Sequence, residues 1–209
     1  SACFRCNSRC LTCNVYERPV DELTAGEWDR VFEALGRAPR WFTFSGGEPF
    51  LRKDLPEIIE SAVRRCRPEV VNIPTNGTYP ERVVDGVKRL CAAIGRTQLV
   101  INVSLDATGE RNDVIRGLRG DFDKPSGTFR ALKDLRLPNL TVGIHSVVSR
   151  HNVRDLPAIS DALMAMEPDQ YIAEPAKERI ELQTIGTGIT PRADDLDALS
   201  QAAQARGNE

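Results

Sequence analysis

The feature of this sequence that most constrains its fold is a regular alternation of strand-like runs with amphipathic helical stripes. The strand candidates are short, apolar and rich in β-branched or aromatic residues: Arg40–Phe44, Val70–Ile73, Leu99–Leu105, Leu140–Val148 and Gln170–Ala173. Between them, apolar residues recur at helical spacing, as in the stripe from Leu55 to Cys66. A strand followed by a helix about every 30 residues predicts βα units and a parallel sheet.

The two ends of the chain predict that it is the core of something longer. Only Ser1–Phe4 stand where a barrel or a curved sheet needs its first strand, so we expect that strand to be largely missing. The chain starts without Met, and its polar end, Gln201–Glu209, has no terminating motif. We therefore expect one domain over residues 1–209, truncated at its N-terminus, and we leave open a truncation at its C-terminus.

Charge and hydropathy narrow the function classes. The chain has 28 Lys and Arg against 30 Asp and Glu, a net charge of −2, so no basic excess draws it to nucleic acid. No apolar run reaches the roughly 20 residues of a membrane helix, and no secretory signal opens the chain. We expect a cytoplasmic protein that binds neither nucleic acid nor membranes.

Four of the six cysteines crowd into one short segment: Cys3, Cys6, Cys10 and Cys13. This placement indicates a reduced compartment and a metal or cluster site rather than a secreted disulfide framework. Cys66 and Cys91 stand on apolar helix faces, where we expect them to be plain core residues.

The spacing C-x3-C-x2-C of Cys6, Cys10 and Cys13 suits thiolate ligation of one metal centre. Three clustered ligands without a second pair favour a [4Fe–4S] cluster with one iron left open for a small molecule, and Cys3 is then not a ligand. The alternative is a zinc site completed by Cys3, in a zinc-stabilised α/β binding module without redox chemistry.

Polar residues share one face of successive strands. In the strand that begins at Leu99, the residues Asn102, Ser104 and Asp106 alternate with apolar ones, and His145 has the same place in the next strand. A filled barrel interior would favour bulky apolar residues there, so the pattern predicts a wet, ligand-holding cavity. The alternative is a buried network in which these polar groups satisfy one another.

Polar motifs also follow the carboxyl ends of three strands, where parallel α/β sheets place their sites. They are Ser45-Gly46-Gly47-Glu48-Pro49, Thr75-Asn76-Gly77 and Ser104-Leu105-Asp106. The two glycines let a ligand approach the backbone closely, and Glu48 offers an acceptor for a cationic group.

Taken together, these motifs resemble the catalytic core of the radical S-adenosylmethionine (radical SAM) superfamily, from about Cys3 to Ala176. The matching segments are the cysteine triplet, Gly46–Pro49, Thr75–Gly77, Val103–Asp106 and Ile115–Gly117. The residues Cys10–Tyr16 and Phe50–Leu55 are similar to the branch that often carries a SPASM or twitch domain. The resemblance implies an α/β fold, a partial (β/α)6 TIM-like barrel.

The resemblance also implies roles for individual residues. Cys6, Cys10 and Cys13 would hold three irons of a [4Fe–4S] cluster, and the fourth iron would bind the amino and carboxylate groups of SAM. The SAM-binding residues would be Ser45, Gly46, Gly47, Glu48, Asn76, Ser104, Asp106 and Arg116. Gly46, Gly47 and Glu48 would receive the SAM amino group, and Arg116 would pair with the SAM carboxylate. One departure is Thr12, because the family commonly has a large apolar or aromatic residue there.

The implied reaction is reductive cleavage of SAM to a 5′-deoxyadenosyl radical, which removes hydrogen from a substrate. A reductant such as flavodoxin or ferredoxin would supply the electron, and the substrate would be a peptide or a small molecule. Candidate substrate contacts are His145, Glu174 and Asn102. The alternatives are a hydrogen-bonded interior histidine at His145 and a solvated charge run at Glu174.

Overall fold

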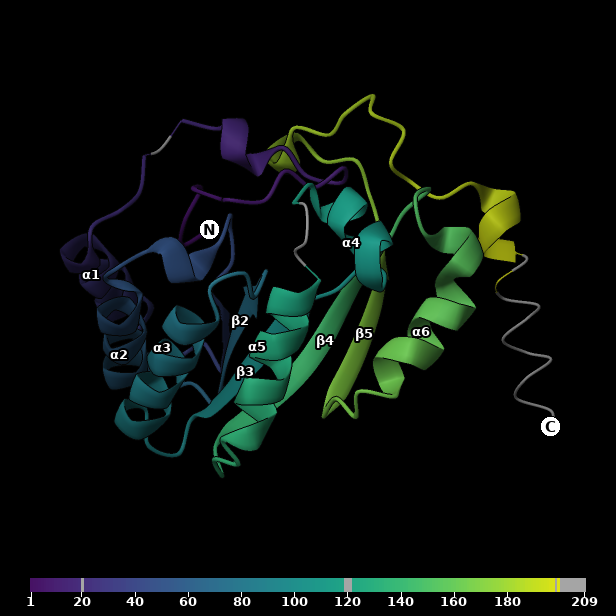
Figure 1. Ribbon diagram of the computed structural model, residues 1–209. Coiled ribbons are helices and arrows are strands. Elements are labelled where there is room, and N and C mark those ends of the chain that lie inside the picture. The colour runs from purple at the N-terminus through teal and green to yellow at the C-terminus, as the bar shows by residue number, and fades with distance from the viewer. Residues whose placement is uncertain (20, 119–121, 198, 200–209) are drawn as a thin grey trace.

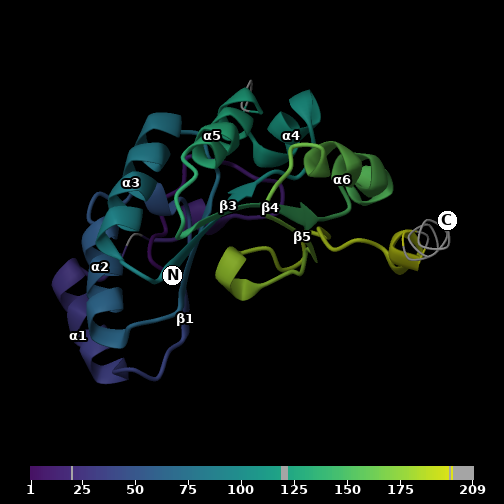
Figure 2. The ribbon, with the colours of Figure 1, turned by 90° about the horizontal axis from the view of Figure 1, so that it is seen from below.

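A five-stranded parallel sheet forms the framework of the chain in a computed structural model that describes residues 1–19, 21–118, 122–197 and 199. The strands stand in chain order: β1 Trp41–Thr43, β2 Val70–Thr75, β3 Gln98–Ser104, β4 Leu140–Val148 and β5 Gln170–Pro175. Each pairs in parallel with the next. Viewed along the strands, the sheet curls into an open half-barrel (Figure 2). The predicted α/β partial barrel is confirmed.

The helices lie on the outer, convex side of this sheet (Figures 1 and 2). They are α1 Ala25–Leu35, α2 Leu55–Cys66, α3 Pro80–Ala93, α4 Gly109–Arg116, α5 Asp123–Asp134 and α6 Leu156–Met164. Short 3-10 turns stand at η1 Val15–Glu17, η2 Pro49–Leu51, η3 Val153–Asp155 and η4 Ile180–Leu182. The apolar faces of the helices pack on the convex face of the sheet, and Cys66 and Cys91 are buried in this core, as predicted. No described helix is long and apolar enough to cross a membrane.

The N-terminal residues lie alongside the turn that follows β1. Cys3 forms a parallel bridge with Gly46. The Ala2 N–H donates to Ser45 O at 2.6 Å, and the Gly47 N–H donates to Cys3 O at 2.7 Å. The N-terminal segment therefore pairs with the chain after β1 through one parallel bridge and two backbone hydrogen bonds.

Arg52 fastens this segment to the rest of the fold. Its side chain is 5% exposed and donates from Nη1 to Ala2 O at 2.8 Å. It also pairs with Asp54 at 2.7 Å and donates to Leu23 O. Because a buried guanidinium is costly without partners, these contacts hold Ala2 and Leu23 together beside η2.

Side-chain alternation in β3 follows the predicted parity as far as Ser104. Leu99, Ile101 and Val103 are fully buried under the helices, and Asn102 and Ser104 face the concave side. The strand ends at Ser104, so the alternation does not continue to Asp106.

Candidate active site

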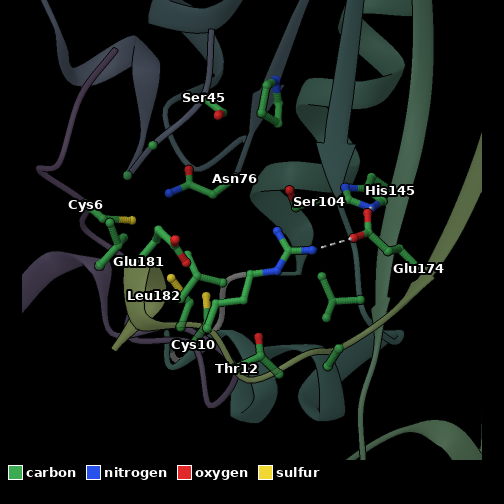
Figure 3. Close-up of a pocket in the computed structure, with 18 of the residues that line it drawn as sticks. Cys6, Cys10, Thr12, Ser45, Asn76, Ser104, His145, Glu174, Glu181 and Leu182 are labelled. Carbon is green, nitrogen blue, oxygen red and sulfur yellow. Dashed lines mark ion pairs between the residues drawn. The ribbon is translucent and has the colours of Figure 1, made fainter. Parts of the chain in front are cut away.

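A cavity of about 460 Å³ opens at the carboxyl ends of the strands. Its walls come from the cysteine segment, the turn after β1, the ends of β2 to β5, the end of α4, and the chain that follows β5. Figure 3 shows Cys6, Cys10, Asn76, Ser104 and Glu174 directed toward this space. The predicted wet cavity therefore exists at the predicted edge of the sheet.

The segment that carries the cysteines rests on the end of α4. The Arg9 N–H donates to Arg116 O at 3.2 Å and the Leu11 N–H donates to Ile115 O at 2.9 Å. Gly117 has a φ of +70°, and a Cβ there would lie 2.1 Å from the Arg9 carbonyl oxygen. Ile115-Arg116-Gly117 is thus the platform for the cysteine loop, and glycine is required at its end.

The thiols of Cys6, Cys10 and Cys13 line the cavity and form no disulfide. Burial raises the pKa of all three thiols, that of Cys10 to about 11. A backbone hydrogen bond from Ser8 to Cys6, another from Val15 to Cys13, and the positive charge of Arg116 all act in the opposite direction. These donors and this charge favour thiolate, the form that binds metal.

The donor set of this cavity is three free thiols from one loop, which suits three ligands of a thiolate-bound iron–sulfur cluster. Among the described residues, no group of three or more Cys, His, Asp or Glu side chains is arranged to hold a single metal ion. A zinc site needs its sulfur ligands about 2.3 Å from one centre. The three thiols line the same cavity.

Cys3 lies outside this set. It is fully buried, is not among the described residues that line the cavity, and donates from Sγ to Arg5 O at 3.3 Å. Burial raises the pKa of Cys3 to about 12 and the negative charge of Glu22 adds to the rise, whereas Arg116 opposes the rise at the three cavity thiols.

Arg116 is a buried cation whose charge acts on all three thiols. Its side chain is 11% exposed, lines the cavity and donates from Nη1 to Asp106 Oδ2 at 3.1 Å. Burial by itself would lower the pKa of Arg116, but Cys10 and Asp106 raise it above the ordinary value. The guanidinium therefore stays charged, with further N–H donors available for an anion.

Asp106 does not face the cavity, contrary to the predicted parity. It is fully buried, with Oδ2 paired to Arg116 and Oδ1 accepting from the Val147 N–H at 2.7 Å. The chain turns after Ser104, so Asp106 points back to the end of β4. Its contact with the site is indirect, because it orients Arg116.

The carboxylate of Glu48, which we expected to accept from a ligand cation, accepts three hydrogen bonds from the protein itself. Its carboxylate accepts from Thr75 Oγ1 at 2.8 Å, from Asn76 N at 2.6 Å and from Phe50 N at 3.1 Å. Burial raises the pKa of Glu48, and these hydrogen bonds oppose the rise. Glu48 lines the cavity, but its oxygens join the turn after β1 to the end of β2.

The paired glycines serve the protein's own chain. A Cβ at Gly46 would lie 1.8 Å from Cys3 O, and one at Gly47 would lie 2.1 Å from Arg5 O. The close approach that glycine permits is therefore made by the N-terminal segment, rather than by a ligand as predicted. The peptides of Ser45, Gly46 and Gly47 still border the cavity.

Asn76 lines the cavity and ties the cysteine loop to β2. Its Nδ2 donates to Asn7 Oδ1 at 2.7 Å and to Ser8 Oγ at 3.0 Å. Thr78 closes the network by donating to Asn76 Oδ1 at 2.9 Å, and Asn7 donates to Thr78. The sequence analysis did not single out Asn7, Ser8 or Thr78. Asn7 and Ser8 are polar residues between two of the cysteines, and that placement could have pointed to them.

His145 and Glu174 meet at the far side of the cavity, as expected for neighbouring strand ends. His145 Nε2 lies 3.5 Å from Glu174 Oε2 but has no hydrogen-bond partner and is buried. Glu174 Oε1 lies 3.6 Å from Arg179 Nη2, the ion pair drawn in Figure 3. His145, Glu174 and Arg179 are thus only loosely paired. His145 Nε2 lacks the hydrogen bond that the alternative, a hydrogen-bonded interior histidine, would require.

Asn102 belongs to a different structure and is not among the described residues that line the cavity. Its Nδ2 donates to Asn72 Oδ1 at 2.9 Å, and its Oδ1 accepts from Gln170 Nε2 at 2.9 Å. The buried-network alternative therefore applies to Asn102. Gln170 reaches across β4 because that strand has Gly143 between them, where a Cβ would lie 2.3 Å from Asn102 Oδ1.

Comparisons with known proteins agree with this arrangement. A family model described as the radical SAM superfamily matches residues 2–163. The chain is 34% identical over 163 residues to Fe-coproporphyrin III synthase of Methanosarcina barkeri, covering 76% of this chain and 38% of that protein. It is 35% identical over 167 residues to PqqA peptide cyclase of Granulibacter bethesdensis, covering 78% and 42%. The chain thus spans less than half the length of these relatives.

Among solved structures, Streptococcus suis SuiB bound to S-adenosylmethionine aligns with a TM-score of 0.73 at 16% identity, covering 97% of this chain and 45% of that one. This likeness shows the fold. Radical SAM proteins use a [4Fe–4S] cluster and SAM, and the matched relatives are enzymes. The family model and the identity to these relatives establish that the chain belongs to the radical SAM superfamily.

Proposed function

We propose that this chain is the catalytic core of a cytoplasmic radical SAM enzyme that removes hydrogen from a peptide or a small molecule. The observation that carries the proposal is one cavity in which three free thiols, the buried cation Arg116 and the unpartnered His145 Nε2 meet. The similarity of this chain to PqqA peptide cyclase supports a place in the branch with SPASM or twitch domains. It also supports a peptide as one candidate substrate.

Cys6, Cys10 and Cys13 would hold the cluster. When bound, the cluster supplies the electron that cleaves SAM reductively, and a carrier such as flavodoxin or ferredoxin would replenish it. Arg116 presents its remaining N–H donors to the SAM carboxylate, and Asp106 keeps the guanidinium in place. The peptides of Ser45, Gly46 and Gly47 and the side chains of Asn76 and Ser104 border the same space and would bind the rest of SAM.

The opposite wall would receive the substrate. His145 Nε2 is buried without a hydrogen bond, a costly state that a ligand acceptor or donor would relieve. Glu174 is only loosely paired on either side, so its oxygens remain available as acceptors.

Anaerobic reconstitution with iron and sulfide tests the proposal. We expect a brown protein with about four irons per chain that binds SAM and, with dithionite, releases 5′-deoxyadenosine. Cys10→Ala should lose the iron, and the control variants Cys3→Ala and Cys66→Ala should keep it. A colourless protein that binds zinc, or equal iron loss in Cys3→Ala and Cys10→Ala, would overturn the assignment.

A further inference from the structure

The chain that follows β5 forms a wall of the cavity that the sequence analysis did not predict. We call residues 177–189 the strap. It contributes Lys177, Arg179, Glu181, Leu182 and Ile189 to the lining. In Figure 1 this segment crosses above the strand ends beside the N-terminal segment, and Figure 3 shows Leu182 near Cys10.

The strap is folded as one unit. Glu178 accepts from the N–H groups of Gly186 at 2.7 Å and Gly188 at 2.5 Å. Thr184 Oγ1 accepts from the Arg179 N–H at 2.9 Å, and the Thr184 N–H donates to Arg179 O at 3.1 Å. These bonds connect the two ends of the segment, so the tip formed by residues 179–184 behaves as one rigid unit.

The tip is attached to the rest of the protein at the cysteine loop. The Asn14 N–H donates to Leu182 O at 2.9 Å, and Asn14 Nδ2 donates to Gln183 O at 3.1 Å. Arg18 Nη1 donates to Glu181 O at 3.1 Å. Around these bonds the tip has little apolar burial, since Ile180 is 79% exposed. The position of the wall therefore depends on these three hydrogen bonds from residues that follow Cys13 and on the loose ion pair between Arg179 and Glu174.

We propose that Asn14 and Arg18 position the strap, so that binding of the cluster by the cysteine loop also closes the wall on the substrate side. The inference rests on the proposed function. A cluster held by Cys13 restrains the next peptide, whose N–H is the Asn14 donor to Leu182. With the thiols unliganded, these donors move with the loop and the strap opens more often. Linkage requires the reverse effect too, so a loosened strap weakens retention of the cluster.

The experiment follows strap opening by trypsin cleavage at the exposed Arg179–Ile180 bond, with mass spectrometry, in the unloaded and the cluster-loaded chain under anaerobic conditions. Cluster loading should slow this cleavage at least fivefold. Arg18→Ala removes one bond and Asn14→Ala another, and each should speed cleavage of the loaded chain by about fivefold, the equivalent of roughly 1 kcal/mol. The matched control is Arg30→Ala, an exposed arginine on α1 that should leave cleavage unchanged.

A second readout is the rate of iron loss to a chelator, which should rise in Asn14→Ala and Arg18→Ala but not in Arg30→Ala. A melting temperature close to the parent's in both variants separates strap opening from general unfolding. Equal cleavage rates with and without a full complement of iron would overturn the proposal. Failure of the proposed function is distinct, because the chain would then take up no cluster in the first place.

Discussion

Replacing Gly47 by Ala should detach the N-terminal segment from the turn after β1. A Cβ at position 47 would lie 2.1 Å from the Arg5 carbonyl oxygen and 2.6 Å from its carbonyl carbon, where ordinary van der Waals contact begins at 3.4 Å. Both neighbours are backbone atoms, so the segment must move by about 1 Å or more. That movement breaks the bonds from Gly47 N to Cys3 O, at 2.7 Å, and from Glu48 N to Arg5 O, at 2.8 Å.

The size of the effect follows from these two bonds. A backbone hydrogen bond contributes about 1 kcal/mol net, so the variant should lose about 2 kcal/mol of unfolding free energy. For a domain of this size, that loss lowers the melting temperature by roughly 4–8 °C. Because Arg5 precedes Cys6, the movement also displaces the first thiol, and iron content after reconstitution should fall.

Thermal melts and iron analysis of the reconstituted protein measure both effects. Gly127→Ala is the matched control, because it lies within α5 with no heavy atom within 4 Å of its Cβ and no positive φ. That variant should keep its iron and gain up to about 1 kcal/mol of stability. If Gly47→Ala melts like the parent and holds a full complement of iron, the close approach does not constrain the segment and the reasoning is refuted.

Three further predictions concern the core, the buried ion pair and acid stability. Leu105→Ala should cost about 2–5 kcal/mol of stability through a core cavity, with SAM affinity unchanged in the folded fraction. Asp106→Asn should instead weaken SAM binding by about 1–3 kcal/mol, because Arg116 loses its orienting partner. Anaerobic SAM titration and thermal melts of the two variants check these predictions. Weaker SAM binding in Leu105→Ala with normal binding in Asp106→Asn would contradict the site. Hydrogen bonds from Arg65 and Ser61 lower the pKa of Asp29, so its contribution is present above the unfolded pKa of about 3.9 and lost as pH falls. The melting-temperature gap between the parent and Asp29→Asn should therefore narrow below about pH 4, and a gap that widens there would contradict the assignment.

Local patterns in the sequence were sufficient for most of the framework. β3 and β4 were predicted to within a few residues, because β-branched residues that alternate with a period of two are typical of strands. The pattern Thr24-x-x-Glu27 is another local signal of a helix start, and α1 begins with this capping box. The cysteine spacing indicated a thiolate site for an equally local reason, since ligands of one centre must lie close together.

The apolar spacing in the sequence did not predict α4 and α5, the two helices between β3 and β4. α4 has few apolar residues among its charges, and α5 includes Pro125, Ser126 and Gly127, which indicate a turn when read alone. Both helices form because the tertiary structure buries Ile115 and Phe129 against the sheet. Their stability comes from packing, which local propensity does not contain.

Side-chain roles at the site were decided by the tertiary structure. The sequence alone placed Glu48, Asp106 and the glycines near the cavity, but their contacts depend on segments far along the chain: residues 3–5 against the glycines, Val147 against Asp106, and Thr75 against Glu48. The strap gave no local signal for the same reason, because its partner Asn14 lies more than 160 residues away in the sequence. A pattern along one strand or helix predicts which face is buried, whereas the partner of a polar group is set by which distant segments the fold brings within hydrogen-bonding distance.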